Sequence, residues 1–120
     1  MKFRTISEGS YSAVTPASAE AHLALDAAGY ARLWDRLIGR GERREIDFEA
    51  EVAVFLLAGE RNTGGYGIEM KGVSVEGETL VVDAAVTGPA PGMMVTQALT
   101  SPWEVVAVER RDVKSVRWGE

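Results

Sequence analysis

Four acidic side chains recur at every second position in one stretch of the chain, and carboxylates at this spacing are the first candidates for chemistry. They are Glu45, Asp47, Glu49 and Glu51. On one strand face they would lie about 7 Å apart, and a carboxylate pair can perform acid–base catalysis or hold a divalent cation. Apolar residues alternate with them, so a solvated sheet face is the simpler interpretation, with Asp47 as a turn cap.

The chain has few residues suited to nucleophilic or metal chemistry. Cysteine is absent and His22 is the only histidine, which excludes a thiolate nucleophile, a disulfide and a two-histidine metal site within one chain. The serines nearest to His22 lie outside any Gly-x-Ser-x-Gly turn, the context of one family of serine nucleophiles; they are Ser7, Ser10, Ser12 and Ser18. We therefore expect a non-enzyme without cofactor or metal, with His22 on the surface or a strand face.

A glycine-rich stretch, Asn62-Thr-Gly-Gly-Tyr66, follows the most apolar segment of the chain. Successive backbone amides of such a turn can bind an anion. A phosphate-binding loop, however, would carry Gly-x4-Gly-Lys-Ser/Thr and open a helix, whereas this stretch has no lysine and precedes a strand pattern. Positive φ angles in a tight connection explain the glycines more simply, although the stretch could also be a partner-binding loop.

Length and composition predict one soluble globular domain over residues 1–120. The chain is 46% hydrophobic and 26% charged, and its net charge of -5 argues against a nucleic-acid partner. No segment has the length and apolar character of a signal peptide core or a membrane span. We expect a cytoplasmic protein as the chain stands, and an extracellular one if a leader was removed.

One helix is predicted after Asp26, whose carboxylate can cap the free amides of a first turn. Its apolar stripe has helical spacing and consists of Tyr30, Leu33, Trp34, Leu37 and Ile38. Gly39 and Gly41 end it.

The strand patterns surround a continuous apolar run, Val52 to Ala58, which indicates a strand covered on both faces. A one-residue slip in alternation at Gly72 predicts a β-bulge, and Glu76-Gly77 predicts a hairpin turn. The remaining strands are expected at 3–7, 10–14, 17–25, 46–52, 66–75, 80–86, 95–99, 103–109 and 113–118. Residues 17–25 could also form a helix, 103–109 is expected to be buried, and the last strand is expected to pair back onto 103–109. The predicted fold class is α+β, a twisted antiparallel sheet of several strands packed with one amphipathic helix.

The order of four segments resembles the C-terminal domain of the PrcB-like protease complex subunits. These segments are Ile46-Asp-Phe48, the apolar strand ending at Gly59, Asn62-Thr-Gly-Gly-Tyr66, and Gln97-Ala-Leu-Thr-Ser-Pro-Trp103 before a valine-rich strand. The resemblance is strongest over residues 30–118. It implies a non-catalytic domain of an accessory subunit that supports an extracellular subtilisin-like protease. Family members usually follow a signal peptide or lipoprotein leader, a pattern that the first residues of this sequence do not show.

Three loops also resemble those of chagasin-like inhibitors of cysteine proteases, in the same order. They are Asn62 to Tyr66, Gly88 to Gly92, and Ser101-Pro-Trp103. The first loop lacks the proline of the chagasin pattern, and Ser101 replaces its arginine. This second resemblance implies a protease inhibitor in place of an accessory subunit.

We therefore predict a partner-binding surface built from three loops. Its residues are Asn62, Thr63, Gly64, Gly65, Tyr66, Met93, Met94, Pro102 and Trp103. Methionine and aromatic side chains are common at binding surfaces, although Met93 and Met94 could instead fold over the sheet as a lid. Trp34 is expected in the core. The sequence is also compatible with a homo-oligomeric structural protein or a small-ligand-binding module.

Overall fold

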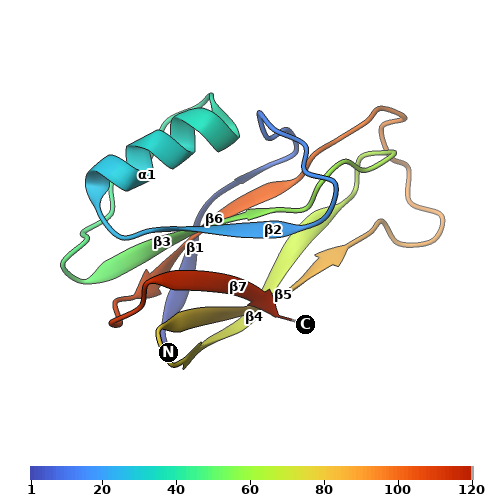
Figure 1. Cartoon of the computed structure of the whole chain (residues 1–120). Helices are drawn as coiled ribbons and strands as arrows, with labels where there is room; N and C mark the ends of the chain where they lie inside the picture. The colour runs from blue at the N-terminus through green and yellow to red at the C-terminus, as the bar shows by residue number, and fades with distance from the viewer. Residues whose placement is uncertain (120) are drawn as a thin grey trace.

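A computed structural model describes residues 1–119, arranged in three layers (Figure 1). Glu120, the last residue of the predicted domain, lies outside the described residues. The layers are a helix, a four-stranded sheet and a three-stranded sheet, so the predicted α+β class is confirmed. The helix is α1 (Ala27–Leu33), continued by one π-helical turn (Trp34–Ile38). The first sheet has the order β1 (Phe3–Gly9), β6 (Trp103–Glu109), β3 (Glu51–Leu57), β2 (Glu20–Ala24), and the second has the order β4 (Gly67–Glu76), β5 (Thr79–Thr87), β7 (Ser115–Gly119).

The antiparallel pair β3–β6 forms the centre of the molecule and is buried on both faces. Phe55 and Val105 belong to the core beneath the helix, whereas Val54 and Val106 belong to the core between the two sheets. All four are fully buried. The prediction that residues 52–58 are covered on both faces is therefore confirmed.

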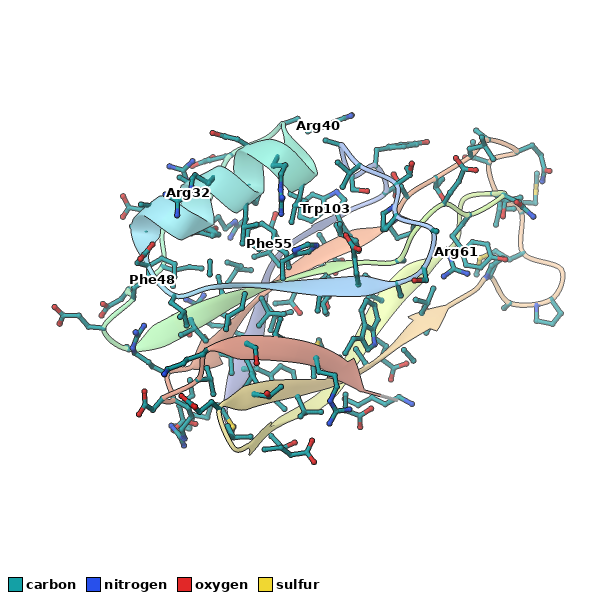
Figure 2. The ribbon with its side chains drawn as sticks, viewed as in Figure 1. Arg32, Arg40, Phe48, Phe55, Arg61 and Trp103 are labelled. Atoms are coloured by element: carbon teal, nitrogen blue, oxygen red, sulfur yellow. The ribbon has the colours of Figure 1, made fainter. Side chains whose placement is uncertain are left out.

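The helix begins and ends where the sequence predicts. The Asp26 carboxylate accepts a hydrogen bond from the Gly29 amide at 2.7 Å, and Gly39 closes the helix with a φ of 73°. Trp34 is in the core as predicted, with its ring 5.7 Å from that of Trp103 in an edge-on contact. Figure 2 shows Phe55 and Trp103 in the layer between helix and sheet. No helix in residues 1–119 has both the length and the apolar character needed to cross a membrane.

Three predicted strands are wrong. Residues 46–50 form a coil and a turn, in which the Asp47 carboxylate accepts a hydrogen bond from the Glu49 amide at 3.0 Å. Ile46 and Phe48 still pack on the core, so their alternation reflects burial without a strand backbone. Residues 10–14 and 95–99 are irregular; the first segment contributes one isolated bridge, Tyr11–Ser101.

The last strand lies in a different sheet from the one predicted. β7 pairs with β5, and in parallel, and Val113 just before it packs in the core between the two sheets. Val116 and Trp118 pack on that core, which is the burial that their alternation indicates. The bulge at Gly72 is confirmed by a register shift between Met70 and Gly72.

Two strand glycines predict opposite effects of an added methyl group. A Cβ atom on Gly9 would lie 2.7–2.9 Å from the Trp103 indole, which is already packed against Trp34, whereas a Cβ on Gly72 would meet nothing within 4 Å. Gly9→Ala should lower the free energy of unfolding by about 1–3 kcal/mol through overpacking. Gly72→Ala should leave it unchanged or raise it by about 0.4–1 kcal/mol. Urea unfolding measures both, and equal stability of the two variants would contradict the packing described for Trp103.

Candidate functional site

The loops that the sequence singles out meet at one end of the molecule, at the right of Figure 1. Arg61 and Thr100 exchange backbone hydrogen bonds of 2.7 and 2.9 Å, and the Gly64 amide donates to the Thr96 carbonyl at 2.9 Å. The Thr100 hydroxyl donates to the Thr63 carbonyl at 2.8 Å. The loop before β4 is therefore joined by main-chain hydrogen bonds to the loop between β5 and β6.

Gly65 and Tyr66 hold these loops in close contact. Gly65 has a φ of 85°, and a Cβ atom there would lie 2.8 Å from both Pro89 and Val95. The positive φ predicted for this stretch is confirmed at Gly65, while Gly64 has an ordinary φ. The Tyr66 ring lies beside Gly88 and has the Arg61 guanidinium 5.7 Å from its centroid. Figure 2 shows Arg61 at this end of the sheets.

Apolar side chains project into solvent from these joined loops. Met94 is 97% exposed, Met93 is 55% exposed and Leu99 is 59% exposed. We call Met93, Met94 and Leu99 the loop surface. A lid role is wrong for Met94, because its side chain contacts solvent almost completely. Leu99 is absent from the predicted surface, since its segment was expected to form a strand; nearby Tyr11, bridged to Ser101, is also exposed.

The remaining residues of the predicted surface lie at different depths. Asn62 and Gly65 are exposed, while Thr63, Gly64 and Tyr66 are half-buried; all five belong to the loop joined to residues 96–100. Pro102 is buried and Trp103 is only 8% exposed. In this structure Trp103 contributes to the core beneath the helix, and its side chain is not part of the exposed surface.

One charged residue that the sequence patterns did not single out, Glu104, is buried next to the loops. Glu104 is 3% exposed and accepts a hydrogen bond from the Thr5 hydroxyl at 3.2 Å. Burial, opposed by the Thr5 hydrogen bond and reinforced by the neighbouring Glu8 carboxyl, raises the pKa of Glu104 to about 7. The signal in the sequence is a single glutamate within the otherwise apolar run Trp103–Val108.

Glu104 lines a cleft of about 320 Å³ between the two sheets. Pro102 and Glu8 lie on the side of the first sheet, and Tyr66, Ile68 and Thr87 lie on the side of the second. The cleft thus opens beside the joined loops. Its lining is mainly polar, with two carboxyl groups and a few apolar side chains, a composition suited to binding a polar or cationic group.

The acidic residues and the histidine that were candidates for catalysis or metal binding do not line this cleft. His22 lies on β2, where its Nε2 atom is 2.9 Å from Glu20 Oε1. Glu51 forms an ion pair with Arg4 at 2.8 Å, and Asp47 caps its turn. Within the described part of the chain, no three metal-ligating side chains form a cluster.

Comparison with known proteins gives one result. Residues 52–109 match the family model described as PrcB C-terminal, which is the family that the sequence resembles. This segment begins in β3, ends in β6 and includes the loop surface and Glu104. No curated protein and no solved structure matches the chain.

The raised pKa of Glu104 predicts how stability depends on pH. The folded protein holds a proton that the unfolded chain releases near pH 4.5, so stability falls as pH rises from about 4.5 to about 7. The loss is on the order of 3 kcal/mol at 1.36 kcal/mol per pKa unit. Glu104→Gln removes this titration and should be more stable than the wild type at pH 8, with little difference at pH 4.5.

Urea unfolding at the two pH values measures this difference. Glu49→Gln, which removes one exposed carboxylate in the turn before β3, is the matched control and should follow the wild type. If Glu104→Gln lost stability equally at both pH values, the burial of a titrating carboxyl at this position would be contradicted.

Proposed function

We propose that the protein is a non-catalytic subunit that binds and stabilises a protease, on the ground that residues 52–109 match the PrcB C-terminal family model. The partner docks on the loop surface, Met93, Met94 and Leu99. Asn62–Tyr66 forms the adjoining part of the interface.

The observation that carries the proposal is the exposure of three large apolar side chains on loops joined by main-chain hydrogen bonds. Methionine side chains adapt to irregular partner surfaces, and their burial on association is favourable. The loss of conformational entropy when loops become ordered opposes binding. The hydrogen bonds from Arg61 to Thr100 and from Gly64 to Thr96 already restrict these loops in the free protein. A partner would therefore meet a largely formed surface.

A second candidate function is inhibition of a cysteine protease, as in the chagasin-like proteins. It is supported by the proximity of the three loops, since a Cβ atom on Gly65 would lie 2.8 Å from Pro89, and the Thr100 hydroxyl, next to the third loop, donates to the Thr63 carbonyl. The burial of Trp103 weighs against it, because an aromatic side chain in the third loop has to be available to the protease. The accessory role is therefore our first proposal.

A binding measurement tests the loop surface. The probe is a subtilisin-like protease taken from the genome that encodes this chain, inactivated by replacing its catalytic serine so that it cannot degrade the chain. The double variant Met93→Ser/Met94→Ser should bind about 30-fold more weakly by calorimetry, because two interface residues that contribute about 1 kcal/mol each contribute about 2 kcal/mol together. Val75→Ser is the matched control: it removes an exposed apolar side chain from β4, about 25–30 Å along the strand from the loops.

The active protease then separates stabilisation from inhibition. An accessory subunit should lengthen the half-life of the subtilisin-like protease without lowering its initial rate, whereas a chagasin-like inhibitor should lower the initial rate of papain. Equal affinity of the double variant and the Val75→Ser control would contradict the role of the loop surface. Absence of any binding by the wild-type chain would contradict the accessory function itself.

A further inference from the structure

The carboxyl group of Glu104 has one oxygen without a partner. Its other oxygen accepts the Thr5 hydrogen bond, whereas Oε2 is buried and accepts no hydrogen bond from a donor in the described chain. A buried carboxylate oxygen without a hydrogen-bond partner is strongly destabilising. The carboxyl group must therefore hold a proton or bind a cation. A cation can reach it through the cleft that Glu104 lines.

A bulge in β1 brings further polar groups to the same place. Regular alternation would turn Thr5 and Glu8 to opposite faces of the strand. The register shift between Thr5 and Ser7 reverses the alternation, and both Thr5 and Glu8 consequently interact with Glu104. Glu8 is itself exposed, so the pair of carboxyl groups extends from the buried strand toward solvent.

We propose that this cleft binds the side chain of a lysine or arginine of the partner protein, with Glu104 and Glu8 as its acceptors. The inference rests on the proposed function, since it names the chemistry of the partner that docks on the loops. The cleft and the loop surface are joined through Tyr66, which lines the cleft and belongs to the joined loops.

Part of the mainly polar cleft wall can contact the aliphatic stem of a side chain that ends in a charge. Ile68, Pro102 and the Tyr66 ring supply apolar contact, and lysine and arginine bury their methylene groups against such surfaces. Among the residues described, no lysine or arginine lines the cleft; Arg61, which contacts Tyr66, lines a separate hollow with Lys71 and Asp83. The net charge of -5 also favours a basic partner.

Binding of a cation should depend on pH in a defined direction. The titratable groups that face Glu104 are Glu8 from β1 and Tyr66 from the loop before β4, while β3 places the apolar Leu56 opposite it. Because the pKa of Glu104 is raised to about 7, the carboxyl group is mostly neutral at pH 6 and mostly charged at pH 8. A cationic ligand should bind more tightly at pH 8.

The test is an NMR titration of the full chain with Nα-acetyl-arginine amide, and with Nα-acetyl-citrulline amide as the neutral isostere. We expect millimolar binding of the arginine compound, with shifts at Tyr66, Thr87 and Glu104, and at least fivefold weaker binding of citrulline. The affinity should fall several-fold from pH 8 to pH 6. Glu104→Gln should lose the preference for arginine, and Glu49→Gln, which changes the net charge equally, should keep it.

Equal binding of the two compounds, unchanged binding by Glu104→Gln, or no binding of the arginine compound would overturn the inference. If Glu104→Gln fails to fold, Glu8→Gln provides the test, because Glu8 is exposed; it should weaken arginine binding about two- to threefold, and no change would overturn the inference.

Binding of the protease partner separates this inference from the proposed function. Weakening by Met93→Ser/Met94→Ser with no effect of Glu104→Gln would reject the cation cleft alone, and no effect of either variant would reject both.

Discussion

The pairing of β3 with β6 is the constraint on which the rest of the structure depends. Both strands are buried on both faces, so the helix and the second sheet are placed by covering these faces, while β1 and β2 pair along the two edges. The helix covers the face that carries Phe55, and the second sheet covers the face that carries Val54. Apolar burial of this extent is the main favourable term in the stability of a domain of this size.

The loop end is an extension of the same ladder. Beyond the Leu57–Trp103 pair, the Ala58 amide donates to the Pro102 carbonyl at 2.9 Å, and the Arg61–Thr100 pair follows. The loops that carry the exposed methionines are thus tied to the most buried part of the molecule. A binding surface on such a support loses less conformational freedom on association than one on free loops.

Glu104 belongs to this ladder as well, and it departs from the apolar composition of the central strands. Its pKa is raised because burial disfavours the charge, and the bulge in β1 supplies only one hydrogen-bond donor, Thr5. Stability would favour a neutral or apolar residue here. A group that lowers stability beside an exposed surface is a common property of binding sites, where recognition and stability make opposite demands.

The elements whose patterns are local could be predicted from the sequence. Asp26 and Gly39 mark the two ends of the helix, and the slip in alternation at Gly72 located the bulge. Helix caps and strand alternation depend on residues that are close in sequence. Pairing of β7 with β5 could not be read, since apolar alternation records burial but not the neighbouring strand. Residues 46–50 were predicted as a strand for the same reason, because Ile46 and Phe48 alternate as buried residues although the backbone there forms a turn.

The depth of the candidate site residues was equally beyond the sequence. Trp103 was assigned to the binding surface and Glu104 was assigned no functional role, although both belong to the predicted strand 103–109 and both are buried. Whether an aromatic residue at a strand end points outward depends on the element that packs over it, and here Trp34 from the helix lies against it. Met93 and Met94 could be selected from the sequence because prolines and glycines exclude regular structure around them.

Hydrogen exchange with and without the inactivated protease is the sharpest test of whether the joined loops form the interface. We expect protection on binding in segments 61–66 and 88–101, with no change in the β4–β5 hairpin around Gly77 at the opposite end. Protection confined to that hairpin or to the helix, with the loops unchanged, would contradict a loop interface.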